Sequence, residues 1–156
     1  MKTNISFLVL FSVLLSFNCG NSSVTADTRE PSAQDYGFLK AKINGKGWAA
    51  SKMQPDKYVS EILQIAGSNG TTALWIQVNE PATGKTENLI QTDLNHYVDE
   101  QFNMYMIKSG KITVTKMNDH WVEGNFSFTA TDDRSKKTIT VTEGEYKVPN
   151  PKSFKN

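Results

Sequence analysis

The chain has 156 residues, with 17 Lys and Arg against 16 Asp and Glu, so its formal net charge at pH 7 is +1. A near-neutral charge without a block of basic residues argues against nucleic acid as the partner. The single cysteine excludes an intramolecular disulfide, so a hydrophobic core must hold the fold together.

The N-terminal residues have the pattern of an export signal. Lys2 precedes an apolar run from Ile5 to Phe17 that only serines interrupt. This run matches a secretory signal and is shorter than the ~20 residues that span a bilayer as a helix. We therefore interpret it as a targeting segment that is not part of the fold.

Two cleavage sites compete directly after this run. The segment Leu15–Cys19 resembles a bacterial lipobox, in which the peptidase cuts before a cysteine whose thiol carries diacylglycerol. Alternatively, an ordinary signal peptidase cuts after Ala26, where Val24 and Ala26 provide small residues. We expect lipidation of Cys19, because an exported protein with one cysteine otherwise carries an unexplained free thiol. Gly20 follows the cysteine, and by resemblance to sorted lipoproteins this favours the outer membrane of the bacterial envelope.

The predicted organisation has four parts. Residues 1–18 form the signal peptide, 19–35 a lipid-anchored tether, 36–148 a β domain and 149–156 a C-terminal tail. The tether is polar and has too little apolar surface to offset the entropy lost on ordering. As a flexible coil it would reach roughly 20 to 25 Å.

From Tyr36 onward, short apolar runs alternate with turn residues, which is typical of antiparallel β structure. Asn44-Gly45 predicts a two-residue hairpin that returns through Trp48, and Ser68-Asn69-Gly70 predicts a second hairpin. Further turns are expected at Ser109-Gly110, Asn118-Asp119 and Asp132-Asp133. The expected strands are Phe38–Ile43, Tyr58–Ala66, Thr72–Asn79, Phe102–Lys108, Lys111–Met117, Trp121–Thr131 and Lys137–Val148.

The stretch from Glu87 to Gln101 is ambiguous. Its apolar residues also fit one face of a helix, and we expect at most a helical turn there. We predict an all-β fold, a single antiparallel β-sandwich, with a small up-and-down barrel as the alternative.

Residue parity in the last strand predicts a bulge. Ile139 and Val141 are odd, whereas Tyr146 and Val148 are even, so both pairs face the core only if an extra residue is inserted between them. Gly144 is the expected position, because glycine accepts the positive φ that a bulge needs.

Four motifs in this order resemble those of a family of small uncharacterised bacterial lipoproteins. They are Ile43-Asn44-Gly45-Lys46-Gly47-Trp48, Gly110-Lys111-Ile112-Thr113-Val114-Thr115, Gly124-Asn125-Phe126-Ser127-Phe128-Thr129-Ala130 and Val141-Thr142-Glu143-Gly144-Glu145-Tyr146. The resemblance implies an exported all-β domain behind a lipidated cysteine, and it implies no known activity.

No pattern in the chain indicates catalysis. His96 and His120 are far apart in sequence and lie in no metal-binding motif, and no serine lies in a G-x-S-x-G elbow. We therefore predict no catalytic residue, no metal site, no cofactor and no enzymatic activity.

Four aromatic residues are the candidate ligand contacts. By parity, Trp75 and Trp121 lie opposite the apolar residues of their strands, so they emerge on the polar face unless a second layer covers them. Together with Tyr97 and Tyr105 they are predicted to form a platform for a sugar ring or a partner protein.

Two functions remain open from the sequence. The first is a membrane-anchored, non-catalytic module that binds envelope glycan or protein. The alternative is a lipocalin-like carrier, in which Phe126 and Phe128 line a cavity for a small apolar ligand.

Overall fold

The computed structural model describes residues 37–54 and 61–150. These residues contain strands and turns and no α-helix, and therefore no helix that could cross a membrane. The strands are β1 (Phe38–Ile43), β2 (Lys46–Ala49), β3 (Lys52–Met53), β4 (Ile62–Ser68), β5 (Ala73–Asn79), β6 (Thr86–Leu89), β7 (His96–Val98), β8 (Met104–Met117), β9 (Trp121–Asp132) and β10 (Thr138–Pro149).

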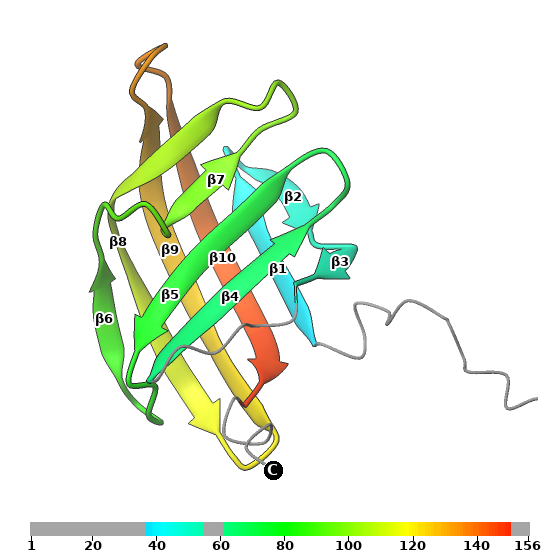
Figure 1. The fold of residues 1–156 in the computed structure, drawn as a ribbon, viewed down its shortest axis with the longest axis vertical. Coiled ribbons are helices and arrows are strands. Elements are labelled where there is room, and N and C mark those ends of the chain that lie inside the picture. Colours follow the sequence, from blue (N-terminus) through cyan, green and yellow to red (C-terminus); the bar gives the residue numbers. More distant parts are fainter. Residues whose placement is uncertain (1–36, 55–60, 151–156) are drawn as a thin grey trace, which may run out of the picture.

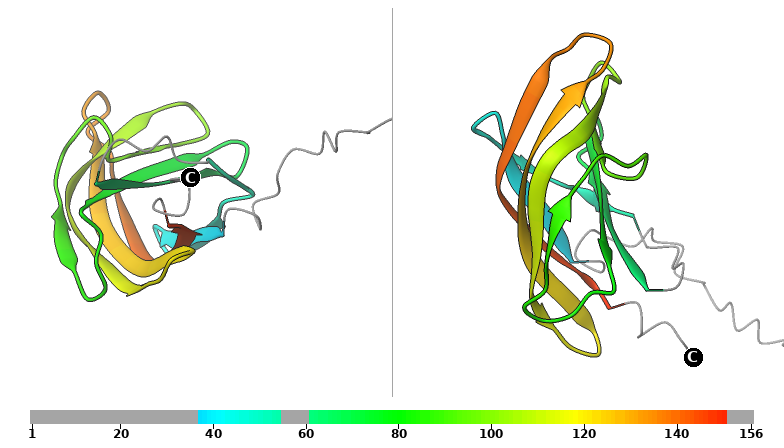
Figure 2. Two further views of the ribbon diagram at one scale, coloured as in Figure 1. Left: turned by 60° about the horizontal axis from the view of Figure 1, so that its bottom comes forward. Right: turned by 90° about the vertical axis from the view of Figure 1, so that its left-hand side faces the viewer.

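All strand pairs are antiparallel and belong to one sheet in the order β2-β1-β10-β9-β8-β7-β5-β4-β3, with β6 paired to β8. The sheet curls into a half-barrel, so that β4 and β5 face β8, β9 and β10 across the core (Figures 1 and 2). The predicted all-β antiparallel class is confirmed. The two layers of the core are halves of one continuous sheet.

A short crossover brings the two edges of the curled sheet together. The backbone N–H of Ala50 donates to the carbonyl of Leu39 on β1 (2.9 Å), and that of Ser51 donates to the carbonyl of Ser68 on β4 (2.8 Å). Two adjacent residues therefore hydrogen-bond to both sides of the half-barrel. This satisfies edge groups that would otherwise be open to pairing.

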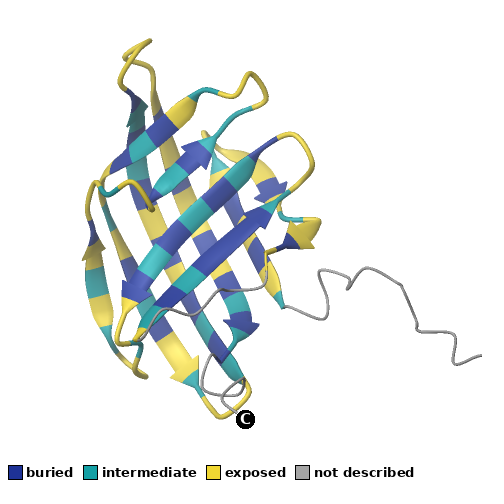
Figure 3. Cartoon of the chain, in the orientation of Figure 1, coloured by how far each residue is buried: buried dark blue, intermediate teal, exposed yellow. Residues whose placement is uncertain are grey.

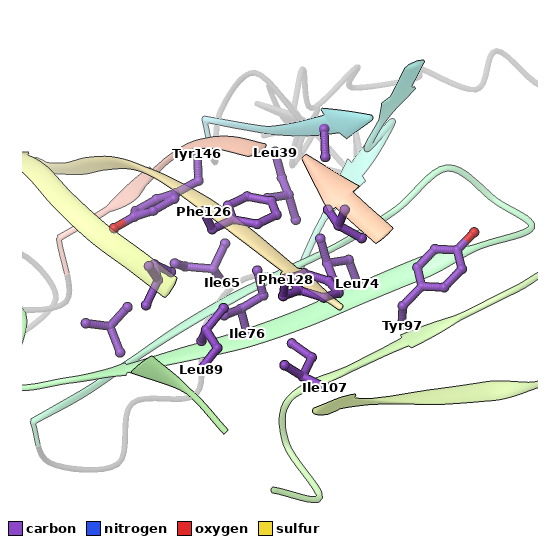
Figure 4. Packing of buried hydrophobic residues seen from close by; sticks show 14 of the residues in the cluster. Leu39, Ile65, Leu74, Ile76, Leu89, Tyr97, Ile107, Phe126, Phe128 and Tyr146 are labelled. Atoms are coloured by element: carbon purple, nitrogen blue, oxygen red, sulfur yellow. The ribbon is translucent and has the colours of Figure 1, made fainter. Parts of the chain in front are cut away.

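The core lies inside the curl and follows the expected alternation of side chains along each strand (Figure 3). Phe126 and Phe128 on β9 stack with ring centroids 6.1 Å apart and are 4% and 3% exposed. Ile65, Ile76 and Leu74 come from the facing strands (Figure 4). The aromatic and branched side chains together bury the apolar area that stabilises the fold.

Both predicted hairpin turns are confirmed. Asn44 and Gly45 have φ of 50° and 78°, the paired positive values that a two-residue turn between twisted strands needs. In the β4–β5 turn, the Asn69 side-chain oxygen accepts from the backbone N–H of Thr72 (2.9 Å) and Gly70 has a φ of 97°.

The predicted bulge in β10 is confirmed, but its backbone geometry differs from the expectation. Val141 pairs with Phe128 and Gly144 with Phe126, so β10 has one more residue than β9 in this interval. Glu143 has the positive φ (51°), whereas Gly144 does not. A Cβ on Gly144 would collide with the ring of Phe126, so glycine is needed there for close packing.

The predicted turn at Ser109-Gly110 was wrong. β8 continues through both residues and only shifts its register against β9 between Ile107 and Ser109. Gly110 lies so close to Phe128 and Ser127 that a Cβ would clash with them. Here glycine allows two strands to approach closely, which sequence alone does not distinguish from a turn.

The ambiguous stretch from Glu87 to Gln101 contains the end of β6, the whole of β7, a turn closed by Asn95 N–H and the Thr92 carbonyl (3.2 Å), and the start of the turn at Asp99. The buried Asn95 side chain accepts from the backbone N–H of Gln77 on β5 (2.9 Å). It thus replaces a ladder bond on the side of β5 where pairing with β7 has ended at Trp75.

Candidate functional site

The two candidate tryptophans lie in different parts of the fold. Trp75, on β5, is half-buried and stacks on His96 with ring centroids 4.7 Å apart, and its Nε1 donates to Gln54 Oε1 (3.3 Å). Burial lowers the pKa of His96 below its usual value, so the imidazole in this stack is neutral at pH 7.

Trp121 begins β9, where the ammonium of Lys147 lies 5.0 Å from its ring centroid. β5 and β9 belong to opposite halves of the curled sheet (Figure 1). In each strand the half-buried tryptophan is next to buried residues in the alternating pattern, which places it on the outer face. The structure therefore does not bring Trp75 and Trp121 together into one platform.

Tyr97 and Tyr105 are brought together. They face each other across β7 and β8 with ring centroids 6.0 Å apart, and they are 7% and 5% exposed. Both rings belong to the core cluster, and Figure 4 shows Tyr97 at its edge. The two tyrosines lie at the open end of the half-barrel, which we call the mouth.

A cavity of about 470 Å³ lies at this mouth, bounded by three turns. The turns join β1 to β2, β4 to β5 and β7 to β8, and all lie in the upper half of Figure 1. Ile43, Ile139 and Trp48 provide apolar lining. The polar lining consists of Asn44, Lys46, Asn69, Thr72, Tyr97, Asp99, Glu100, Gln101 and Tyr105.

Asp99 organises the turn between β7 and β8. Its Oδ1 accepts from the backbone N–H groups of Gln101 and Asn103 (both 2.9 Å), and its Oδ2 accepts from the Tyr105 hydroxyl (3.1 Å) and Asn103 Nδ2 (3.0 Å). Burial acts to raise the pKa of Asp99, but the hydrogen bonds from Asn103, Gln101 and Tyr105 outweigh it and hold the pKa below its usual value. The carboxylate is therefore ionised and rigidly placed.

Trp48 and Thr72 connect two other walls of the cavity. Trp48 Nε1 donates to the buried Thr72 hydroxyl (2.6 Å), which in turn donates to Asn69 Oδ1 (2.9 Å). This chain of hydrogen bonds links β2 to the β4–β5 turn. The side chains on both walls are thus placed before any ligand arrives.

The two tyrosine hydroxyls remain protonated at neutral pH. Burial raises the pKa of Tyr97, and the charges of Asp99 and Glu100 add to that effect. Burial also raises the pKa of Tyr105, as do its hydrogen bond to Asp99 and the charge of that carboxylate. The cavity therefore combines hydroxyl and amide donors with carboxylate and amide acceptors.

Asp99 does not have the electrostatic properties of a general acid or base. A general acid or base needs a pKa moved toward neutrality, whereas the pKa of Asp99 is moved away from it. His96 lies on the outer face, stacked on Trp75, and His120 is exposed in the β8–β9 turn. Within residues 37–54 and 61–150, no three His, Cys, Asp or Glu side chains group in a way that could hold a metal ion.

Among the residues that line the cavity, Tyr97 and Tyr105 were candidates from the sequence, whereas Trp48 and Asp99 were not. A signal existed in the turn residues. Because consecutive antiparallel strands alternate in direction, the turns after β1, β4 and β7 meet at one end of the sheet. Asn44, Asn69 and Asp99 are therefore brought together by topology, although they are distant in sequence.

Cys19 lies outside the described residues. Fold and cavity define a small all-β protein with a half-barrel whose mouth is hollow and polar. Residues 36–149 match a family described as a domain of unknown function (DUF6252), and the chain belongs to this family. No curated protein and no solved structure matches the chain.

Proposed function

We propose that the protein is a lipid-anchored, non-catalytic module of the bacterial cell envelope that binds a glycan in the cavity at the mouth of the half-barrel. The observation that carries this proposal is the lining of the cavity, in which fixed donors and acceptors surround an apolar patch. A sugar presents the same combination, because its hydroxyls need polar partners and its C–H face needs apolar contact.

The size and charge of the cavity narrow the ligand class. A concave space of about 470 Å³ suits a small ligand or the end of a chain better than the flat surface of a protein. Asp99 and Glu100 outnumber Lys46 among the charged lining residues. We therefore propose a neutral or amino-bearing saccharide, since an anionic one would be repelled.

The position of the first strand is consistent with a tethered module. Phe38 pairs with Lys147 near the end of β10, whereas the cavity lies toward the opposite end of the sheet (Figure 1). A lipid anchor that precedes residue 37 would therefore hold the cavity away from the membrane. The proposed outer-membrane address and the lipid on Cys19 come from the sequence.

The carrier alternative receives less support. It requires an internal space lined by Phe126 and Phe128, but these rings stack on each other in the packed core and do not line the cavity at the mouth. A carrier would have to open this core to load its ligand, at a cost of several kcal/mol for the lost packing.

The anchor is tested by expressing the full-length chain and Cys19→Ala in a bacterial host. We expect the wild-type protein in the membrane fraction, with a mass that shows diacylglycerol at Cys19, and the variant in the soluble fraction. N-terminal mass spectrometry after fractionation distinguishes the outcomes. A soluble wild-type product that begins at Asp27 would contradict the anchor.

The ligand class is tested by titrating the Cys19→Ala protein with N-acetylglucosamine oligomers and with oligogalacturonates as the anionic counterpart. We expect the neutral oligomers to bind, and Glu100→Gln to weaken binding about tenfold, because a charged acceptor is lost from the cavity. Calorimetry measures both affinities.

Asp119→Asn is the matched control for this titration. Asp119 is exposed in the β8–β9 turn, at the end of the sheet opposite to the cavity, and the same carboxylate-to-amide change should leave affinity unaltered there. Tighter binding of the anionic oligomers would refute the proposed neutral or amino-bearing ligand class. Equal effects of the two substitutions, or no binding of either oligomer, would refute a glycan site at the mouth.

A further inference from the structure

A second cleft lies beside the mouth, between the β7–β8 and β9–β10 turns. It has a volume of about 280 Å³, and its lining includes Phe102, Met104 and Met106 on one side and Arg134 on the other. The turn held by Asp99 separates the two spaces, because Glu100 and Gln101 line the cavity whereas Phe102 and Asn103 line the cleft.

Phe102 is an unusual residue for its position. Its side chain is 85% exposed, and its backbone has a φ of 61°, a conformation that a bulky side chain adopts only at a cost. Asparagine or glycine would suit this turn better, and solvent would suit a polar side chain better. Neither the turn nor the core explains a phenylalanine here.

Hydrogen bonds fix the backbone of the turn that carries this ring. The backbone N–H of Phe102 donates to the Asp99 carbonyl (3.0 Å), and Asp99 N–H donates to the Asn103 carbonyl (3.1 Å). The Asp99 carboxylate additionally fixes the residues on both sides of Phe102. An exposed aromatic side chain on a fixed backbone suits a protein interface, because it has only two side-chain torsions to order when it is buried.

The charged residues of the cleft indicate which kind of group a bound molecule would place next to Phe102. Asp133 pairs with Lys108 (3.0 Å), and Asp132 accepts hydrogen bonds from the backbone of Arg134 and Ser135 within its own turn. Among the described residues, the Arg134 guanidinium makes no hydrogen bond or close ion pair, although its charge acts on Asp132 and adds to the Ser135 hydrogen bond in lowering the pKa of that carboxyl. A carboxylate on a molecule bound in the cleft could form a bidentate ion pair with this guanidinium.

We propose that this cleft binds a segment of a partner protein in which an apolar side chain lies next to an Asp or Glu. Phe102, Met104 and Met106 contact the apolar side chain, since methionines adapt to varied shapes, and Arg134 binds the carboxylate. The cleft lies at the end of the sheet far from Phe38 (Figure 1). If the protein is held by the proposed lipid on Cys19, the cleft therefore faces away from the lipid surface.

An array of random hexapeptides, probed with the labelled Cys19→Ala protein, tests this inference. We expect the bound peptides to be enriched in an apolar residue next to Asp or Glu. Phe102→Asn and Arg134→Gln should each weaken binding of a selected peptide at least about tenfold. Phe102→Asn should retain or raise the thermal midpoint, because asparagine tolerates a φ of 61° better than phenylalanine.

Phe38→Asn is the matched control, because Phe38 is also exposed but lies at the other end of the sheet. It should leave peptide binding unchanged. Vesicles that contain phosphatidylglycerol form the second arm of the experiment. Vesicle binding that depends on Phe102 would overturn the inference in favour of a lipid surface, and an array without Phe102-dependent peptides would overturn it as well. Phe102 and Arg134 do not line the cavity at the mouth, so the peptide and vesicle results are independent of the glycan titration.

Discussion

Replacing Asp99 by alanine is expected to lower the free energy of unfolding by about 2 kcal/mol and to abolish binding at the mouth. Its carboxylate accepts from two backbone N–H groups, from Asn103 Nδ2 and from the Tyr105 hydroxyl. The donors of Asn103 and Tyr105 are part-buried, and leaving such donors unpaired costs about 1–3 kcal/mol. Urea unfolding measures the loss of stability, and calorimetry with N-acetylglucosamine oligomers measures the loss of binding.

Two further variants make the expectation for Asp99 specific. Asp99→Asn keeps an oxygen that can accept from the backbone of Gln101 and Asn103, so we expect a smaller loss than with alanine. Asp119→Ala, in an exposed turn, should change the free energy of unfolding by less than about 0.5 kcal/mol. Equal losses at positions 99 and 119 would mean that Asp99 does not organise the turn.

The Asp99 carboxyl also predicts a dependence on pH. Its pKa is lower in the folded state than the ordinary value of 3.8, so its contribution to stability is present above that value. The contribution is lost as the pH falls below about 4, through the folded pKa. The difference in stability between wild type and Asp99→Asn should therefore shrink as the pH is lowered in this range.

Gly124→Ala is expected to destabilise the fold by about 3 kcal/mol, at the upper end of what overpacking usually costs. Gly124 on β9 pairs with Tyr146 on β10 and with Val114 on β8. A Cβ at this position would collide with the Thr113 carbonyl oxygen and with the Tyr146 hydroxyl, which donates to that same carbonyl (3.3 Å). Thermal and urea unfolding measure the effect.

Gly47→Ala is the control, because it is the same change on strand β2 with open space around the new methyl group. It should alter the free energy of unfolding by less than about 0.5 kcal/mol. A Gly124→Ala protein as stable as Gly47→Ala would show that β8, β9 and β10 can separate without cost. That result would contradict the close packing of Tyr146 on the glycine.

Glycines illustrate the limit of sequence reasoning in this fold. Gly45 in Asn44-Gly45 was assigned correctly, because a two-residue turn needs positive φ and few residues accept it. Gly110 was assigned to a turn but lies within β8, where it makes room for Phe128. Both uses of glycine look alike in a sequence, and only the neighbouring strand distinguishes them.

The sequence predicted only some of the residues of the candidate site, because it does not show which strands face each other. Parity placed Trp75 and Trp121 on the polar face, and both lie there half-buried, but parity within one strand does not report which strands face each other. The curl of the sheet separates these two residues and brings Tyr97 and Tyr105 to the mouth. Phe102 was assigned to the start of a strand, and its exposed position in a turn depends on the hydrogen bonds of Asp99.

Local pattern alone determined the all-β class, the two hairpin turns and the bulge before Gly144, because each depends on the preferences of a few consecutive residues. The tertiary structure decided that the strands form one curled sheet and that the turns after β1, β4 and β7 enclose a cavity. It also decided that the turn held by Asp99 lies between this cavity and the Phe102 cleft. These features depend on contacts between residues far apart in the chain. Such contacts are set by the packing of the whole core rather than by any single segment.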